Sequence, residues 1–337
     1  MRVFFPNLMG LVSLLLLGAC ASAPPTSGTA TPAPAPARTA QGVTAPAALS
    51  PSEAAEPAES ARRSVRSAAV WLASGVDSWF GDKPFADGGK VTNGRFSVSV
   101  LKRQDAGVDL KVRFNASFRL PNLENSAYLF IGRDDPRDLI TDTPAAFSRQ
   151  QRLLTETAAD TTFFAGLGRS LGEQVDFRLG FRGGIKPYAQ GRYRRPWRLG
   201  PADDIEFRET LFWSVNDHFG STTALSYDHA FSPTLAGRWL SAATVTQTDS
   251  KFEWHSSLGA YKSLGNQRLL SLELLANGKQ GSGVLLTDYG IQTRWEQPVH
   301  KDWLLGEFII GHFWPRASAL VPRSRAWALG AGLKMKF

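Results

Sequence analysis

The last residues of the chain read Trp327-Ala328-Leu329-Gly330-Ala331-Gly332-Leu333-Lys334-Met335-Lys336-Phe337. Every second residue is apolar, and all but one of these are large, whereas the residues between them are alanine, glycine or lysine. Successive side chains of a β-strand point to opposite faces of a sheet. The sequence therefore predicts a strand with one apolar face and one small or polar face.

The same alternation recurs upstream. From 108 to 120, Val, Leu and Phe residues alternate with Asp, Lys, Arg, Asn and Ser. Glu209 breaks the rule, because it falls on the apolar face of its segment. A period of two over so many segments predicts an all-β fold. The other segments that follow the rule are 175–182, 205–215, 252–260, 285–296 and 304–313.

The length of these segments separates two kinds of β protein. A strand tilted by about 45° needs about 9–11 residues to cross a bilayer, whereas the strands of soluble proteins often have about 5–6 residues. Segments of about 10–12 residues with alternating hydrophobicity indicate a transmembrane barrel. Most tryptophans lie near segment ends, as the aromatic girdles of such a barrel require. A backbone in lipid must satisfy its own hydrogen bonds, so we expect the strands to close on themselves.

A terminal strand of this pattern that ends on an aromatic residue resembles the assembly signal of Gram-negative outer-membrane β-barrel proteins. The resemblance implies barrel-assembly machinery and outer-membrane lipid as partners. We expect an antiparallel up-and-down barrel over residues 91–337 with about 14 strands, or about 12 if two segments are misassigned. Both ends of the barrel then lie on the periplasmic side. The residues that carry the resemblance are Trp327, Leu329, Leu333, Met335 and Phe337.

The N-terminus indicates export. An apolar stretch over 8–17 has the length of a signal-peptide core rather than of a membrane span. It ends in Leu17-Gly18-Ala19-Cys20, which resembles the lipobox of bacterial lipoproteins, and Cys20 is the only cysteine of the chain. The resemblance implies a signal peptide over 1–19, a Cys20 that carries lipid such as palmitate, and lipoprotein-sorting machinery as a partner. A plain secretory signal with an unmodified thiol is the alternative.

Two segments of different composition connect the signal to the barrel. Residues 20–58 are mainly Ala, Pro, Thr and Ser, a composition that does not offset its ordering entropy and predicts a disordered tether. Residues 59–90 begin with apolar residues at helical spacing and predict a short amphipathic helix and a segment that leads into the barrel. Three roles stay open for the helix: docking at the entrance of the barrel, lying on the membrane surface, or plugging the lumen.

Charged residues gather on the strand face that points away from lipid. Its carboxylates lie mainly after residue 250, which leaves a local excess of arginine. Rings of Arg attract anions in pores, so we expect a lumen that binds or passes an anionic solute or a lipid head group. The alternative is a closed structural or envelope-assembly barrel filled with salt bridges. The candidate anion-binding residues are Arg178, Arg182, Arg192, Arg194, Arg198 and Arg208.

A lipid-modifying hydrolase is a second alternative. His255 and Ser257 have the spacing of the His and Ser found in outer-membrane lipid hydrolases, and a His can activate a Ser hydroxyl. The other motifs of those families are absent around them, however. The alternation also points both side chains inward, away from acyl chains. We therefore expect no catalytic residue.

The remaining signals predict neither metal nor cofactor. Asp134, Asp135, Asp138 and Asp142 lack EF-hand spacing and are expected to form a solvated acidic part of a long external loop over 134–157. Five scattered histidines and one cysteine do not provide the spacing of a metal site. The net charge of +8 is compatible with nucleic acid, but the export signal argues against that partner.

Replacing Cys20 with Ala should abolish incorporation of labelled palmitate, because this thiol is the only acceptor that the chain offers. Labelling and intact mass measured on the envelope fraction check this, with Ser22→Ala as the control next to it. Unchanged mass and unchanged labelling in the Cys20→Ala variant would refute lipidation.

Overall fold

The computed structural model describes residues 58–67, 69–70, 90–120, 127–142, 161–248, 252–280 and 283–337. Cys20, the signal peptide and most of the predicted tether lie outside the described residues. So do residues 71–89 of the segment that leads into the barrel and residues 143–157 of the predicted external loop.

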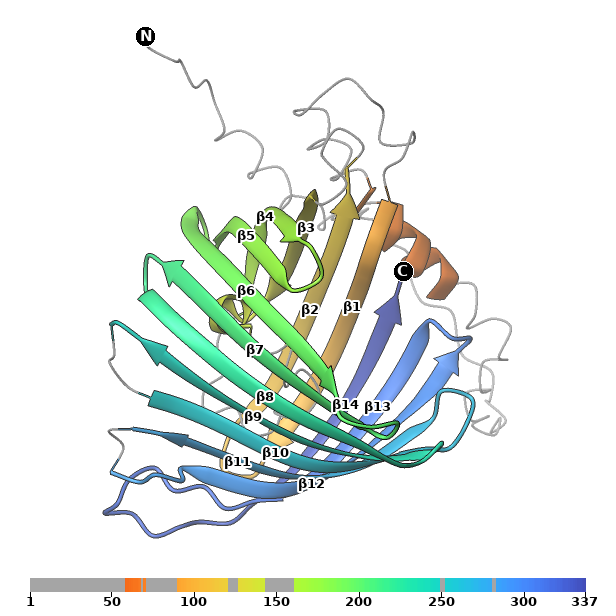
Figure 1. Ribbon diagram of the computed structural model, residues 1–337. Helices are drawn as coiled ribbons and strands as arrows, with labels where there is room; N and C mark the ends of the chain where they lie inside the picture. Colours follow the sequence, from red (N-terminus) through yellow and green to blue (C-terminus); the bar gives the residue numbers. More distant parts are fainter. Residues whose placement is uncertain are drawn as a thin grey trace, which may run out of the picture. The chain divides into compact units, whose positions relative to one another are not determined.

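The described residues form one closed barrel of 14 strands (Figure 1). Each strand is antiparallel to its neighbours in sequence, and β1 pairs with β14 to close the wall. The predicted fold class is confirmed, with 14 strands rather than 12. The strands are β1 (Lys90–Arg103), β2 (Val108–Arg119), β3 (Ala127–Asp134), β4 (Thr162–Leu171), β5 (Val175–Arg182), β6 (Lys186–Arg198), β7 (Asp203–Ser214), β8 (His218–Ser232), β9 (Leu235–Thr246), β10 (Phe252–Ser263), β11 (Leu269–Lys279), β12 (Asp288–His300), β13 (Leu304–Phe313) and β14 (Ala326–Lys336).

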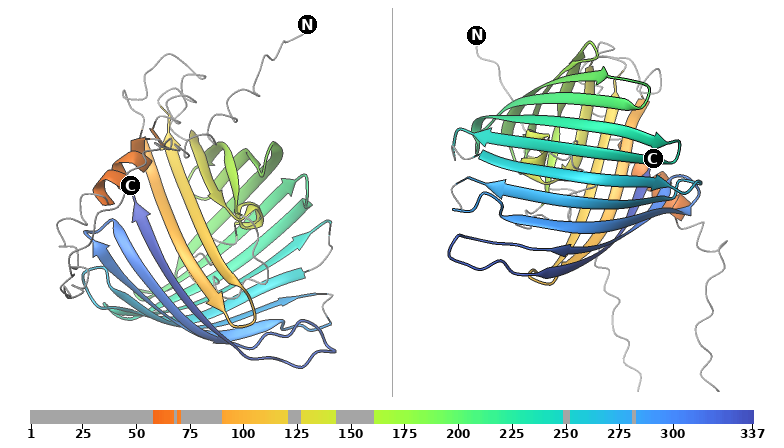
Figure 2. Two further views of the ribbon diagram at one scale, coloured as in Figure 1. Left: turned by 180° about the vertical axis from the view of Figure 1, so that it is seen from behind. Right: turned by 60° about the horizontal axis from the view of Figure 1, so that its bottom comes forward.

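The apolar face of the strands is the outer face of the barrel. On β14 the side chains of Trp327, Leu329 and Leu333 are 57%, 60% and 49% exposed, whereas the intervening Ala328 is buried. Leu179 on β5 and Leu211 on β7 also lie on the outer face and are exposed. Figure 2 shows that the strands run obliquely across the wall. Long tilted strands with an apolar exterior are those of a membrane-spanning barrel.

The chain ends on the seam between β1 and β14. The register pairs Phe96 with Met335, and the Phe337 ring stacks on Phe114 of β2 with ring centres 5.9 Å apart. Gly94 leaves room for this ring, because a Cβ at that position would lie 2.7 Å from it. Met335 shares the outer face but is buried, unlike the other apolar residues of the predicted assembly signal.

A helix over 58–67 and 69–70 lies beside the end of the barrel at which β1 begins and β14 ends (Figure 1). Glu59 pairs with Lys301 in the β12–β13 turn, and this hydrogen bond lowers the pKa of Glu59. The Arg62 guanidinium lies 4.9 Å from the centre of the Trp303 ring.

The far end of this helix reaches the outer wall. Ala69 belongs to a buried apolar cluster with Phe118 and Leu129, whose side chains point outward from β2 and β3. The helix therefore docks against the barrel and does not plug the lumen. The described helices include none with the length and hydropathy that a membrane span requires.

Replacing Phe337 with Ala should lower the free energy of unfolding by roughly 1–2 kcal/mol, because the half-buried ring loses its apolar contacts at the seam. Urea titration of the refolded barrel in micelles measures the change. Lys336→Ala is the matched control, because its side chain is exposed next to the same seam. An unchanged midpoint in the Phe337→Ala variant would contradict a role of this ring in holding the seam.

Candidate functional site

A short helix, α2 (Pro136–Thr141), occupies part of the lumen. It follows β3 directly, and it contacts the inward side of β6, β7 and β8. Ile140 is completely buried in an apolar cluster with aromatic side chains from four strands. The prediction of a solvated acidic external loop is wrong for residues 135–142, because apolar packing draws this segment into the barrel. The aromatic partners of Ile140 are Phe130, Phe164, Tyr188 and Phe212.

Asp142 holds the C-terminal end of α2 against the wall. Its carboxylate lies 3.2 Å from Arg192 Nη1 and 3.4 Å from Arg208 Nη1. Gln190 adds a hydrogen bond of 2.8 Å from its side-chain amide to the Ile140 carbonyl. Asp142 adopts the left-handed conformation with φ 55°, which ends the helix and turns its side chain to these arginines.

The other side of α2 is linked to a different part of the wall. Arg137 Nη2 lies 2.7 Å from Glu253 Oε2 on β10, and Glu253 Oε1 accepts a second ion pair, of 2.6 Å, from Lys279. The helix is thus tied to β6 and β7 on one side and to β10 on the other. A helix held in this way narrows the lumen at its own level.

Asp135, which precedes the first turn of α2, is buried rather than solvated. Asp135 caps the helix by accepting hydrogen bonds from the backbone N–H groups of Arg137 and Asp138. Burial, together with the nearby carboxylates of Asp135 and Asp134, raises the pKa of Asp138 to about 7. In the described part of the chain, no group of three or more His, Cys, Asp or Glu residues has an arrangement that suits a metal ion.

All six predicted anion-binding arginines lie on the inward face of β5, β6 and β7, and every one has a carboxylate partner. The sequence analysis missed these partners, because it placed the carboxylates mainly after residue 250. The side chains of Arg194 and Arg198 are the most open, at 51% and 80% exposed. Their ion pairs are also loose, at 3.9 Å to Glu206 and 3.4 Å to Asp204. The other pairs are Arg178–Asp176, Arg182–Asp217, Arg192–Asp176, Arg192–Asp142, Arg208–Glu206 and Arg208–Asp142.

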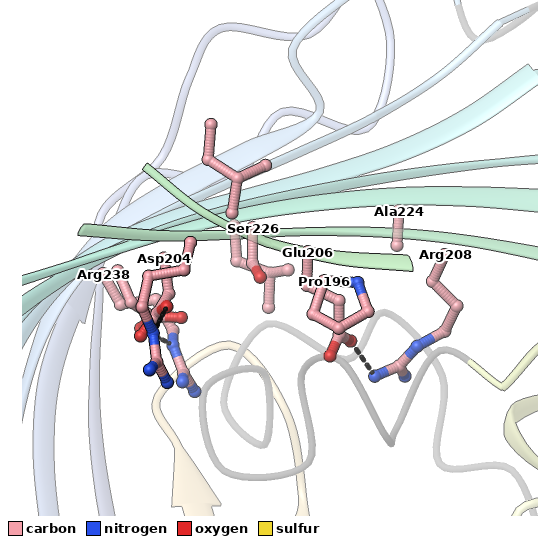
Figure 3. A pocket seen from close by; sticks show the side chains of 11 residues that line it. Pro196, Asp204, Glu206, Arg208, Ala224, Ser226 and Arg238 are labelled. Carbon is pink, nitrogen blue, oxygen red and sulfur yellow. Dashed lines mark hydrogen bonds and ion pairs between the residues drawn. The ribbon is translucent and has the colours of Figure 1, made fainter. Parts of the chain in front are cut away.

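A polar cavity of about 480 Å³ lies on the inward face of β6–β9 (Figure 3). Each of its arginines pairs with a carboxylate, and Arg238 joins the set through its pair with Asp228. In Figure 3 the Arg208 and Arg238 side chains extend further from the strands than Asp204 does. An arginine is longer than an aspartate, so the guanidinium groups lie nearer the centre of the lumen. The charged residues that line the cavity are Arg198, Arg208, Arg238, Asp204, Glu206 and Asp228.

A second charged cluster, on β11–β14, is packed rather than open. Arg294 is 2% exposed, with its guanidinium 3.8 Å from Glu273 and 3.7 Å from Glu307. Lys334 pairs with Glu307, and Gln292 donates a hydrogen bond to Glu273. This part of the lumen wall is a compact cluster of opposite charges rather than an open cavity.

The candidate hydrolase pair faces inward, as the alternation predicts. His255 and Ser257 lie on the same side of β10 as Glu253, and Ser257 is buried. The outer side of β10 carries Phe252, Trp254 and Leu258 instead. Cleavage of a lipid requires access to its acyl chains, which would lie beyond the opposite face of the wall.

Comparisons with known proteins return barrels of outer membranes. No protein-family model and no curated protein sequence matches the chain. Among solved structures, the KdgM porin in complex with disordered oligogalacturonate is 9% identical, with a TM-score of 0.37, and covers 72% of this chain and 99% of that chain. An anion-selective porin from Comamonas acidovorans is 9% identical, with a TM-score of 0.43, and covers 74% of this chain and 100% of that chain.

The outer-membrane channel DcaP of Acinetobacter baumannii is also 9% identical, with a TM-score of 0.43, and covers 76% of this chain and 99% of that chain. The solutes and binding residues of those proteins do not transfer to the present chain.

Replacing Asp142 with Asn should loosen α2, because it removes the carboxylate between two arginines while Asn still adopts the left-handed backbone. Breaking a buried ion pair costs about 3–5 kcal/mol. We therefore expect trypsin to cleave after Arg137 at least about tenfold faster than in the wild type, as measured by mass spectrometry on the folded barrel. Asp105→Asn in the β1–β2 turn is the control. Equal cleavage rates would show that Asp142 does not hold the helix.

Proposed function

We propose that the chain is a bacterial outer-membrane β-barrel lipoprotein, anchored through Cys20 on the periplasmic side, that binds and passes an anionic solute. The membrane location is supported by the closed wall and its exposed apolar exterior, since an even number of tilted antiparallel strands is the architecture of such proteins. The lipobox supports export to that membrane.

One observation supports the anionic solute above all. Arg194 and Arg198 expose their guanidinium groups to the lumen and hold their carboxylate partners only loosely. The residues lining the cavity itself carry equal numbers of positive and negative groups, so a count of charges does not select a solute. The selection comes from reach, because the longer arginines place their N–H groups where a solute carboxylate or phosphate meets them first.

The position of α2 supports passage of a small solute rather than of a folded polymer. The helix narrows the lumen between Asp142 on one side and Arg137 on the other. A solute that enters the cavity next to it exchanges water for bidentate contacts with arginine, which is the usual recognition of carboxylate and phosphate groups. A lipid head group with the same chemistry is a second occupant that fits these contacts.

The packed cluster on β11–β14 favours a second candidate function, a closed structural barrel. Arg294, Glu273 and Glu307 are buried at the lumen wall, where an open water-filled channel would expose them. In that case the barrel supports the envelope without conducting, and the arginines of β5–β7 stabilise the wall through their ion pairs.

Replacing Arg194 and Arg198 together with Gln should lower the anion-to-cation permeability ratio roughly threefold to fivefold. One charge at about 4 Å in water contributes about 1 kcal/mol, which is a factor of about five. The reversal potential in a salt gradient across a planar bilayer measures this ratio. Arg195→Gln is the matched control, because Arg195 lies on the same strand but points to the outer face.

Two outcomes would change the conclusion. A wild-type barrel that inserts into the bilayer without any conductance would support the closed structural barrel instead. Conductance with the same anion preference in the double variant would show that Arg194 and Arg198 do not select the solute.

A further inference from the structure

Glu209 places a carboxyl group in the middle of the apolar outer face. The outward row of β7 reads Asp203, Ile205, Phe207, Glu209, Leu211 and Trp213, so two apolar residues flank Glu209 on either side. Leu211 is 60% exposed, and this part of the wall is therefore not covered by the described chain. Acyl chains provide no hydrogen bonds to a carboxyl group at this depth, and such a group is costly there.

Hydroxyl groups of the next strand satisfy part of this carboxyl group. Ser221 donates to Oε1, and Thr223 donates to Oε2 at 2.6 Å. Each carboxylate oxygen accepts more than one hydrogen bond, so both keep accepting capacity toward the outside. Glu209, Ser221 and Thr223 thus form an acceptor centre on the outer face of β7 and β8.

A donor centre lies two strands further along the same face. The hydroxyls of Ser241 on β9 and Ser256 on β10 are 2.7 Å apart, and the Trp239 indole N–H points to Ser256 at 3.3 Å. One serine donates to the other, so the second hydroxyl hydrogen is left to bond beyond this pair. Ala243 on β9 lies between the two centres, because it pairs with Thr223 of the acceptor centre and stands two residues from Ser241 of the donor centre.

We propose that the outer faces of β7–β10 form a two-fold contact with a second copy of this chain inside the membrane. In an isologous contact each surface meets its own copy, so the acceptor centre of one copy meets the donor centre of the other, and the reverse. The two-fold axis passes near Ala243, between Glu209 on one side and the Ser241–Ser256 pair on the other.

The chemistry of this surface favours a second copy over lipid. Small side chains let two backbones approach closely, and hydroxyl groups supply hydrogen bonds between them, as in contacts between membrane-spanning segments. A lipid tail leaves the spare capacity of Glu209 unused. A second copy supplies the hydroxyls of Ser241 and Ser256 to that spare capacity. The inference rests on the proposed membrane location, but not on the solute.

Replacing Glu209 with Leu should dissociate the dimer. We expect the full-length wild type to be dimeric by native mass spectrometry in mild detergent, and the Glu209→Leu variant to dissociate at least about tenfold more readily. Ser241→Leu should have the same effect from the opposite side of the contact. Thr293→Leu is the control, because Thr293 points outward from β12, away from this surface.

Cross-linking in membranes tests the same contact without removing it. An Ala243→Cys variant should form a disulfide-linked dimer on oxidation of outer membranes, and the wild type, whose single cysteine is the lipid-bearing Cys20, is the control that forms none. A wild type that stays monomeric at all concentrations, together with an Ala243→Cys variant that forms no cross-link, would overturn the dimer. Anion conductance by that monomer would leave the proposed transport function standing, so the two failures are distinguishable.

Discussion

A strand in a membrane has no water to bond with, so each of its N–H and C=O groups must find a partner on a neighbouring strand. This constraint requires β1 to meet β14 and makes the wall continuous. Once the wall is closed, the two faces of every strand are in different solvents. The outer face selects apolar side chains along the whole barrel, and the inner face is free to carry charge, which is how one sheet supports both insertion and a polar site.

The same constraint explains why the sequence predicted the strands so well. Alternation is a local property, so β14 and β2 are each recognisable from their own residues. Once a strand is assigned, the direction of Arg178 or Arg198 follows from its position in the alternation. The position of α2 does not follow in this way. It depends on contacts between Asp142 and two arginines 50 and 66 residues further along the chain, and six residues are too few to show a helical period.

The charges of the lumen illustrate a second limit of sequence reasoning. A run of arginine in β5–β7 predicts an excess of positive charge, but it does not show that Asp142 returns from a loop to lie between Arg192 and Arg208. Ion pairs across adjacent strands cancel most of the excess. What remains is a difference in reach and exposure, and this difference belongs to side-chain geometry. The charge that a lumen leaves free is therefore judged better from the carboxylates on the strand next to each arginine than from the total number of charges.

Glu209 is informative for the opposite reason. On the inner face a glutamate is one charge among many and finds a partner, as Glu206 does three residues earlier. On the outer face the same side chain has two hydroxyl partners and, among the residues that the structure describes, no cation within ion-pair distance. The neighbouring residues of its own strand on that face are apolar. A polar residue that breaks the alternation is therefore more informative on the lipid side than on the lumen side, because lipid tails provide neither hydrogen bonds nor an opposite charge. Such an exception points to another protein surface at that depth, and the hydroxyls of β9 and β10 provide the complementary chemistry on the same wall.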